Sequence, residues 1–286
     1  MEEPSEGYVK VLGFNIYYRS FGRPEKGTVL ALAGGPFDPH NYLLPMADLA
    51  QFGYRVVMYD QLGCGKSDRP KGAKYYTQIH AVDDAEGVRR ALRLGTVHLF
   101  GSSYGGALAL DMALRYPKSL RSLMISNGFA SRALQASERN RLFSHLPREI
   151  QDTITKYEDK GDVKNPKYLA ACDVFYRRHV CRLRVWPYDF WYTMEHFSDD
   201  NLGNDLPDRL KGWDITDRLP EIGLPCLITV GKYDLITPKC SRAIQRGIRG
   251  SKLFMFEKGS HLPMWEDREQ FMEIVRDFLD SVKILK

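Results

Sequence analysis

The residues with the clearest chemical signature form a G-x-S-x-G pattern centred on Ser103, within residues 101–106. An apolar run at residues 97–100 precedes the pattern, and an amphipathic helical pattern at residues 104–116 follows it. A serine in this setting sits on a sharp, strained turn that exposes its hydroxyl group, and the glycines let the helix approach the strand. We therefore predict that Ser103 is a catalytic nucleophile. The alternative is a glycine-rich strand–helix turn without chemistry.

A serine hydroxyl is a weak nucleophile at neutral pH and needs a general base. His261 follows the apolar run at residues 253–256, which places it on a loop at the carboxyl edge of a sheet. Asp234 follows the run at residues 226–230, and a carboxylate there would orient the imidazole and stabilise the imidazolium. The chain order Ser103, Asp234, His261 is the one expected for a serine triad built on this strand–turn–helix arrangement.

The remaining histidines and one further aspartate are weaker candidates. His98 lies inside a strand pattern, where we expect it to pack. Asp60 ends a strand before Ser103 in the chain, and we expect it to stabilise a turn. The other histidines lack a strand-end context and are expected at the surface or in the cap described below: His40, His80, His145, His179 and His196.

Acyl transfer also needs backbone N–H groups that bind the developing oxyanion. One donor is expected from Tyr104, the residue after the nucleophile, and the other from the loop after the apolar run at residues 28–33. That loop contains Gly34 and Gly35, and glycine lets the backbone approach the substrate oxygen. Gly35 or Gly34 is the expected second donor, and an ordinary turn is the alternative.

The elements that hold these residues alternate between buried strands and amphipathic helices. Short, continuously apolar runs bounded by turn residues fit strands that are buried on both faces of a parallel sheet. They cover residues 28–33, 54–59, 97–100, 120–125, 226–230 and 253–256. Helical patterns cover residues 77–94, 104–116 and 271–282, and residues 8–11 and 15–18 alternate as a hairpin does. We predict an α/β fold with a mostly parallel sheet and helices on both faces.

The alternation breaks between Gly128 and Asp214, where no comparable strand run occurs and aromatic residues accumulate. An insertion of this kind is expected to form a cap over the carboxyl edge of the sheet, where such folds place their sites. We expect three segments: residues 1–127 as the first part of the core, residues 128–214 as a helical, aromatic cap, and residues 215–286 as the second part of the core.

Composition limits the class of protein. In 286 residues, 41 Lys+Arg against 36 Asp+Glu give a formal charge of +5, too small to indicate nucleic-acid binding. No apolar run approaches the roughly 18 residues of a membrane span, and the acidic N-terminus lacks the features of a signal peptide. The five cysteines include no CxxC pair, so we expect neither a structural zinc site nor a disulfide framework. We expect a cytoplasmic monomer or small homo-oligomer that acts on a short peptide or small acyl substrate, without metal, cofactor, nucleic acid or membrane.

Several segments carry a family resemblance. They read YDQLGCGKS (59–67), GSSYGG (101–106), WDIT (213–216), GSHL (259–262) and MWED (264–267), with NPKY (165–168) and WP (186–187) in the cap. Together they resemble the proline iminopeptidases, serine aminopeptidases of the α/β-hydrolase fold, over nearly the whole chain. The resemblance is greatest to the archaeal type that trims short peptides released by a giant protease. It implies release of N-terminal residues, proline among them, without metal or cofactor.

Two departures from the family pattern fall where the substrate is recognised. The oxyanion loop of the family normally reads His-Gly-Gly-Pro-Gly, whereas this chain has Ala33 and Phe37 at the two ends. Gly34 is retained, and Phe37 is expected to narrow or reshape the acyl pocket. The family also binds the substrate's ammonium group with two glutamates. These align near Gly203 and at Leu235, neither of which is acidic.

An unpaired, partly buried ammonium group would cost several kcal/mol. Either another carboxylate replaces the glutamates, or the substrate has no free amine. The possible replacements are Glu195, Asp199, Asp200 and Asp205, for which a solvated acidic loop is the alternative. Trp186 and Glu195 are the substrate contacts expected from the cap. An acidic substrate could instead meet a cluster of cap arginines, for which a solvated helix face is the alternative: Arg177, Arg178, Arg182 and Arg184.

We predict a serine hydrolase, an aminopeptidase of proline-iminopeptidase type that releases N-terminal proline or apolar residues through an acyl-enzyme. The first alternative is an esterase, amidase or lactonase that uses the same triad without recognising a free amine. The second is a non-catalytic relative that serves as a binding or receptor protein, against which the complete set of serine, aspartate and histidine argues. Epoxide hydrolase and dehalogenase chemistry is disfavoured, because it needs a carboxylate at the position of Ser103.

Overall fold

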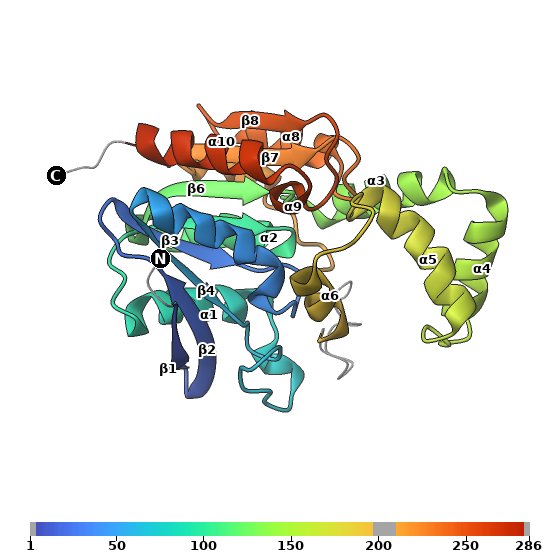
Figure 1. Ribbon diagram of the computed structural model, residues 1–286, viewed down its shortest axis with the longest axis horizontal. Coiled ribbons are helices and arrows are strands. Elements are labelled where there is room, and N and C mark those ends of the chain that lie inside the picture. The colour runs from blue at the N-terminus through green and yellow to red at the C-terminus, as the bar shows by residue number, and fades with distance from the viewer. Residues whose placement is uncertain (1–3, 197–209, 283–286) are drawn as a thin grey trace.

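An eight-stranded sheet forms the centre of the computed structural model, which describes residues 4–196 and 210–282 (Figure 1). The strands are β1 (Ser5–Val11), β2 (Phe14–Phe21), β3 (Gly27–Leu32), β4 (Tyr54–Tyr59), β5 (Val97–Ser102), β6 (Leu120–Ser126), β7 (Cys226–Gly231) and β8 (Lys252–Phe256). Their order in the sheet is β1-β2-β4-β3-β5-β6-β7-β8. β2 pairs antiparallel with β1 and β4, and all other neighbours pair parallel. The predicted α/β fold with a mostly parallel sheet is confirmed.

The hairpin predicted from the alternating N-terminal residues is present as β1 and β2. Tyr8 lies opposite Tyr17, and the turn between the strands has φ angles of 48° at Leu12 and 93° at Gly13. Positive φ at both central residues gives a hairpin turn whose twist matches that of its strands.

Helices and short 3₁₀ segments connect the strands. The helices are α1 (Gln78–Ala91), α2 (Tyr104–Arg115), α3 (Arg132–Ser144), α4 (Arg148–Glu158), α5 (Pro166–His179), α6 (Tyr188–Glu195), α8 (Pro238–Gly247), α9 (Pro263–Glu266) and α10 (Arg268–Ser281). The 3₁₀ segments are η1 (His40–Phe52), η2 (Ala73–Tyr75), η3 (Pro117–Ser119) and η4 (Thr216–Glu221). The three helical patterns in the sequence correspond to α1, α2 and α10. Periodicity did not predict η1, which contains Pro45.

The central parallel strands are buried on both faces, as their continuous apolar runs predicted. Every residue of β5 and of β7 is buried. On one face, α1, α2 and α8 contribute Val82, Leu108 and Ile244 to a single apolar cluster. On the other face, η1 and α10 contribute Leu43 and Phe271 to a second cluster. The sheet is therefore a rigid platform whose carboxyl edge holds the connecting loops in place.

Helices α3 to α6 lie between β6 and β7 in the chain. Figure 1 shows α3, α4 and α5 projecting from the side of the sheet, with α6 closer to it. A β-bridge joins Ser131 to Asp214, and the Arg132 N–H donates to the Trp213 carbonyl oxygen at 3.0 Å. The chain thus enters and leaves the insertion through adjacent segments. The described part of the insertion is helical, as expected, and its division at residues 128–214 stays a prediction.

The insertion has two packing partners. Its outer helices share a small apolar cluster of their own, which includes Ile154, Cys172 and Phe175. The inner helix α6 is tied to the core, because the Tyr42 N–H of η1 donates to Thr193 Oγ1 at 3.1 Å. The outer helices therefore form a lobe, which is also tied to the core because Thr237 Oγ1 donates to Glu138 Oε2 of α3 at 2.9 Å. Helix α6 is part of the wall above the sheet.

Among residues 4–196 and 210–282, no helix has both the length and the apolar character needed to cross a bilayer. All five cysteines are buried, and none forms a disulfide bond.

Candidate active site

Ser103 occupies the turn between β5 and α2. Its φ of 58° and ψ of −124° lie in a region that few non-glycine residues adopt, which is the backbone strain expected of a nucleophile on such a turn. A Cβ atom at Gly101 would clash with the carbonyl oxygen of Gly105, and one at Gly105 would clash with that of Leu32. Both glycines are therefore required for α2 to approach β5 and β3, which agrees with the role predicted for them.

Asp234 and His261 form a buried hydrogen-bonded pair on the two loops that follow β7 and β8. The distance between His261 Nδ1 and Asp234 Oδ1 is 2.6 Å, and the two residues are 8% and 1% exposed. The Ile236 N–H also donates to Asp234 Oδ1, at 2.8 Å. These bonds fix the carboxylate and leave Nε2 as the imidazole nitrogen that can exchange a proton with another group.

The electrostatic surroundings of His261 suit a general base. Burial opposes the charged imidazolium, but the charge and hydrogen bond of Asp234 outweigh it, so the pKa of His261 is raised above its ordinary value of 6.5. The paired carboxylate therefore makes the imidazole a stronger base for the Ser103 proton.

The loop between β3 and η1 is a neighbour of both Ser103 and His261. A Cβ atom at Gly34 would lie 2.8 Å from Ser103 Cβ, and the Gly34 carbonyl oxygen accepts a hydrogen bond from the Asp38 N–H at 3.4 Å. Asp38 in turn interacts electrostatically with His261. The structure forms no hydrogen bond between Ser103 Oγ and the His261 ring. Catalytic hydrogen bonds of this kind are often long until substrate is bound, and the pairing of the two side chains stays a prediction.

Asn127 is a site residue that the sequence analysis missed. It follows β6 with a φ of 58°, and its Nδ2 donates to Asp234 Oδ2 and, at 3.1 Å, to the carbonyl oxygen of Ser260. The Ser126 hydroxyl donates to Asn127 Oδ1 at 2.6 Å. A polar residue directly after a buried strand was the available signal, and it is the same signal that identified Asp234.

Glu266 holds the loop of His261 from the other side. Its carboxylate accepts hydrogen bonds from the backbone N–H and the hydroxyl group of Ser260, both at 2.6 Å. It also accepts one from the backbone N–H of Arg182, in the segment between α5 and α6, at 2.6 Å. One carboxylate therefore connects the His261 loop to the insertion.

The oxyanion loop distinguishes between the two candidate glycines. The Gly34 N–H donates to Tyr42 Oη at 2.7 Å, so it is already engaged. Gly35 has a φ of 98°, and a Cβ atom there would lie 2.7 Å from the backbone nitrogens of Phe37 and Asp38, so only glycine fits. Gly35 is therefore the better candidate for the second donor. Tyr104, the first expected donor, is the first residue of α2.

The residues expected to be structural have structural partners. Asp60 accepts hydrogen bonds from the His40 N–H at 3.0 Å and the Lys66 N–H at 2.9 Å, and its Oδ1 lies 2.7 Å from His40 Nδ1. Burial opposes its charge, yet these partners lower the pKa of Asp60, so the predicted turn role is confirmed. The expectation that His40 lies at the surface or in the cap is wrong, because its contact with Asp60 buries it at the start of η1. His98 is buried in β5 beside Ser122 at 2.8 Å, and burial lowers the pKa of His98 to about 4.

The expected substrate contacts have different settings. The Phe37 ring is buried and packs edge-to-face against the Tyr76 ring, with the ring centroids 5.4 Å apart. The backbone φ of Phe37 is 74°. The Trp186 ring is buried against Phe190, and its Nε1 donates to the Cys181 carbonyl oxygen at 3.0 Å. Glu195 is exposed at the end of α6, and Leu235 is partly buried against the core. The role of these residues in substrate binding stays a prediction. Asp199, Asp200, Gly203 and Asp205 lie outside the described residues.

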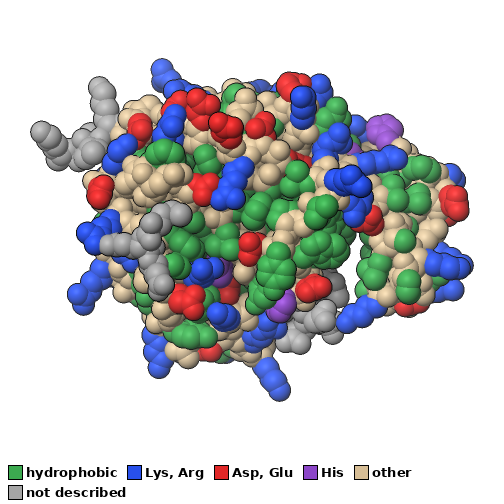
Figure 2. Space-filling view, in the orientation of Figure 1, with side chains coloured by type: hydrophobic (Ala, Val, Ile, Leu, Met, Phe, Trp, Pro, Cys, Tyr) green, Lys and Arg blue, Asp and Glu red, His purple; other side chains and the backbone are tan. Residues whose placement is uncertain are grey.

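Hydrophobic side chains gather over α6 and the segment before it, beside the projecting lobe (Figure 2). Those with large exposed fractions are Val185, Tyr188, Trp191 and Met194. Within the lobe, a cavity of about 170 Å³ lies between α3, α4 and α5, and Phe143, Phe175 and Tyr176 contribute to its lining. The surface of α6 is apolar, whereas the cavity of the lobe is also lined by charged and polar side chains, among them Arg139, Asn140 and Glu158.

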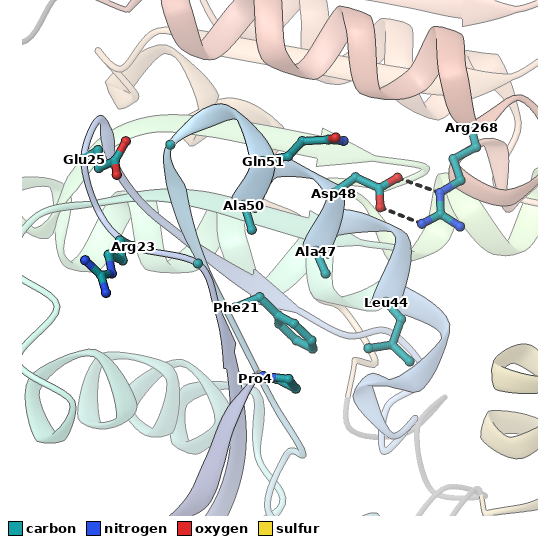
Figure 3. A pocket seen from close by; sticks show the side chains of 12 residues that line it. Pro4, Phe21, Arg23, Glu25, Leu44, Ala47, Asp48, Ala50, Gln51 and Arg268 are labelled. Carbon is teal, nitrogen blue, oxygen red and sulfur yellow. Dashed lines mark hydrogen bonds and ion pairs between the residues drawn. The ribbon is translucent and has the colours of Figure 1, made fainter. Parts of the chain in front are cut away.

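A larger hollow of about 780 Å³ lies away from these residues (Figure 3). Phe21 at the end of β2 and Leu44 of η1 line it, together with Asp48 and Arg268, whose side chains are joined at 2.7 Å. None of the proposed catalytic residues lines this hollow. In the described part of the chain, no group of three or more His, Cys, Asp or Glu side chains could hold a metal ion.

Comparison with known proteins identifies close relatives. The family model of the α/β hydrolase fold matches residues 27–160. The proline iminopeptidase of Saccharolobus solfataricus is 39% identical over 288 residues, which cover 97% of this chain and 93% of that protein. The crystal structure of the proline iminopeptidase of Mycobacterium smegmatis matches with a TM-score of 0.86 at 30% identity, covering 96% of this chain and 98% of that chain. The crystal structure of VinJ matches with a TM-score of 0.93 at 32% identity, covering 98% and 100%.

Proposed function

The chain belongs to the proline iminopeptidase family of α/β-hydrolases, and from this we propose that it releases proline or another apolar residue from the N-terminus of short peptides. The observation that carries the proposal is the hydrogen-bonded pair of Asp234 and His261, at the same sheet edge as the strained Ser103. The reaction needs water and three kinds of protein group: a nucleophile, a general base and oxyanion donors. The chain has a candidate for each of the three.

In the first half of the reaction, Ser103 Oγ attacks the carbonyl carbon of the N-terminal residue. The hydroxyl proton passes to His261 Nε2, because Nδ1 is bonded to Asp234. The carbonyl electron pair moves to oxygen, where the N–H groups of Tyr104 and Gly35 stabilise it. When the intermediate collapses, the C–N bond breaks and the proton on His261 moves to the leaving nitrogen. The shortened peptide leaves, and the N-terminal residue remains as an ester on Ser103.

In the second half, water replaces the peptide. His261 takes a proton from the water as its oxygen attacks the ester carbon, and the same oxyanion donors act again. The C–O bond to Ser103 then breaks, and the proton returns from His261 to Ser103 Oγ. The products are the free amino acid and the original enzyme, so the two halves sum to hydrolysis of one peptide bond.

Residues 128–214 are proposed as the cap that shields this chemistry. The apolar side chains of α6 support a site that excludes water and accepts an apolar or cyclic first residue. The absence of disulfide bonds among the five buried cysteines supports a reducing, cytoplasmic setting. A monomer or small homo-oligomer stays our expectation.

Substitution of Ser103 tests the proposal. We expect Ser103→Ala to reduce the hydrolysis of a prolyl arylamide by at least about a thousandfold while the circular dichroism spectrum stays unchanged. Ser119→Ala, in η3 and outside the site, is the matched control and should keep full activity. Retained activity in Ser103→Ala would remove the mechanism.

A substrate panel tests the requirement for a free amine. The purified enzyme is assayed on a prolyl arylamide, on the same compound with an acetylated nitrogen, and on a simple acyl ester. The aminopeptidase proposal predicts that acetylation lowers kcat/KM strongly. Faster hydrolysis of the acetylated compound would support the esterase or amidase alternative instead.

A further inference from the structure

Asp38 places a carboxylate beside the proposed oxyanion hole. It lies in the loop between β3 and η1, and its N–H donates to the Gly34 carbonyl oxygen at 3.4 Å. A Cβ atom at Gly35 would lie only 3.1 Å from the carboxyl carbon of Asp38, so the lack of a side chain at Gly35 makes room for this carboxyl group. The carboxylate is therefore a close neighbour of the N–H group proposed to bind the oxyanion.

The Asp38 carboxylate has no hydrogen-bond or ion-pair partner among the described residues. Its carboxylate accepts no hydrogen bond and forms no ion pair within residues 4–196 and 210–282, although the residue is half-buried. Among the described residues, Asp38 forms hydrogen bonds only through its backbone: its N–H donates to Gly34, and its carbonyl oxygen accepts from the Cys64 thiol. A carboxylate withdrawn from water without a cation or donor is unstable unless a ligand supplies one.

Four titratable groups face Asp38 from different elements. His261 comes from the loop after β8 and is the basic group among them. Asp38 also contributes, after burial, to the raised pKa values of Tyr42 on η1, Tyr176 on α5 and Cys64 after β4. Burial raises the pKa of Asp38 itself to about 7, and His261 only partly offsets this. The surroundings thus disfavour a bare carboxylate and would favour one that is paired with a cation.

The proposed reaction brings a cation to this place. In a peptide with a free N-terminus, the ammonium nitrogen lies about 2.5 Å from the carbonyl carbon under attack, since only Cα separates them. The two family glutamates that would receive this ammonium align near Gly203 and at Leu235, which are not acidic. A carboxylate next to the oxyanion loop is within reach of the same nitrogen.

We propose that Asp38 binds the α-ammonium group of the substrate, in the role that the family gives to two glutamates of other segments. This assignment rests on the proposed aminopeptidase function and names the residue that recognises its substrate. Asp38 reaches the amine from the oxyanion loop of the core.

The position of Asp38 also explains how a substrate without an amine is rejected. During attack, negative charge develops on the carbonyl oxygen beside Gly35, and an unpaired carboxylate nearby opposes it. A bound ammonium group neutralises Asp38 and removes this repulsion. The same residue therefore favours free-amine substrates and disfavours neutral ones.

The test compares two substrates in two variants. Asp38→Asn keeps the size of the side chain and removes its charge. We expect kcat/KM for a prolyl arylamide to fall about 10- to 100-fold, mainly through KM, because one charged hydrogen bond is lost. We expect hydrolysis of an acetyl ester, which has no amine, to rise, because the charge that opposes the oxyanion is removed. Asp217→Asn, an exposed aspartate of η4, is the matched control and should change neither rate.

The pH profile adds a second readout. On the prolyl arylamide, kcat/KM of the wild-type enzyme should depend on two deprotonations on the acid side, those of Asp38 and His261. For Asp38→Asn on either substrate, it should depend on His261 alone. On the acetyl ester, protonation of wild-type Asp38 removes its repulsion of the oxyanion, so the acid limb should be no steeper than that of His261 alone. The acid limb of log kcat/KM is therefore expected to have a slope of about 2 for the wild-type enzyme on the prolyl arylamide and of about 1 or less in the other cases.

A measurement on the wild-type enzyme keeps the proposal testable if Asp38→Asn does not fold. Prolinamide and tetrahydrofuran-2-carboxamide have similar rings, but only the first carries a cation at neutral pH. We expect prolinamide to inhibit ester hydrolysis at least about tenfold more strongly. Equal inhibition would overturn the proposal.

The outcomes separate this inference from the proposed function. If the wild-type enzyme does not hydrolyse the prolyl arylamide, the proposed function fails, and the inference falls with it. If the wild-type enzyme does so and Asp38→Asn retains the same preference for free-amine substrates, only the inference fails. Loss of that preference in Glu195→Gln, with Asp38→Asn unaffected, would assign the ammonium group to the cap and overturn the role of Asp38.

Discussion

Asn127 donates a hydrogen bond to the carboxylate of Asp234 across the carboxyl ends of the neighbouring strands β6 and β7. The same amide group donates to the carbonyl oxygen of Ser260, next to His261. One side chain therefore holds both the proposed triad carboxylate and the loop that carries the imidazole. Asn127 orients the carboxylate of Asp234 through a hydrogen bond, and Asp234 orients the imidazole of His261 in the same way.

Removal of the Asn127 amide should weaken catalysis more than substrate binding. We expect Asn127→Gly to lower kcat about 10- to 100-fold with little change in KM, because Asp234 loses a donor while the substrate pocket keeps its shape. Glycine is chosen because the φ of 58° at this position is accessible to it without strain. Steady-state kinetics on a prolyl arylamide measure both constants.

Asn127→Ala is the companion variant that separates the amide from the backbone. It should show the same loss of kcat and an additional loss of about 1 kcal/mol in the free energy of unfolding, because alanine is strained at positive φ. Full activity in either variant would mean that Asn127 does not position the triad.

The close approach of α2 to the sheet predicts a severe effect at Gly105. A Cβ atom there would overlap the carbonyl oxygens of Leu32 and, at 2.6 Å, Ala33. We expect Gly105→Ala to reduce the free energy of unfolding by about 2–3 kcal/mol or more and to abolish activity, since the turn at Ser103 must shift. Urea denaturation followed by circular dichroism measures the first quantity.

Gly223→Ala provides the control for a glycine substitution, because no atom lies within 4 Å of the added Cβ and φ is not positive there. Its free energy of unfolding should stay within about 0.5 kcal/mol of the wild-type value. Equal stability of the Gly105 and Gly223 variants would contradict the close packing of α2 against β3.

The pH dependence of the reaction should follow the charge on Asp234. Burial lowers the pKa of His261, but Asp234 outweighs it and raises the pKa above its ordinary value. His261 must be neutral to accept the proton of Ser103, so activity falls as the pH drops through this raised pKa. Without the Asp234 carboxylate, only the smaller effects of Asp38 and Glu266 oppose burial, so the pKa of His261 falls. We therefore expect Asp234→Asn to move the acid limb of kcat/KM to lower pH and to reduce kcat about ten-thousandfold.

This profile is best recorded on a neutral acyl ester, whose hydrolysis does not require ionised Asp38. Asp217→Asn should leave the acid limb in place. An acid limb that stays put or moves to higher pH in Asp234→Asn would show that Asp234 is not the group that raises the pKa of His261.

The sequence predicted the features that are local in the chain. Continuous apolar runs identified the buried strands, because a strand covered on both faces has no polar side to break the run. Ser103, Asp234 and His261 follow such runs directly, so the topology of a parallel sheet was enough to expect them at one edge. The glycines around Ser103 were equally predictable, since the clash that they avoid arises within the same strand–helix turn.

Features that depend on contacts between distant segments were not predictable. The choice between Gly34 and Gly35 depends on the Tyr42 hydroxyl, which reaches Gly34 from η1. The role of Asn127 depends on the pairing of β6 with β7, which places its amide beside Asp234. Asp38 is placed by an irregular loop that includes a positive φ at Phe37, and no periodic pattern encodes such a loop.

The Ser131–Asp214 bridge has a consequence for how this enzyme can diversify. Because the chain enters and leaves the insertion at two paired residues, the segment between them can be replaced by another without changing the strand order of the sheet. A chimaera joined at these two positions would combine the proposed cap of another protein with the unchanged Ser103 turn of this one. If Asp38, which belongs to the core, recognises the amine, the chimaera would change its preference for the substrate's side chain. It would still require a free N-terminus.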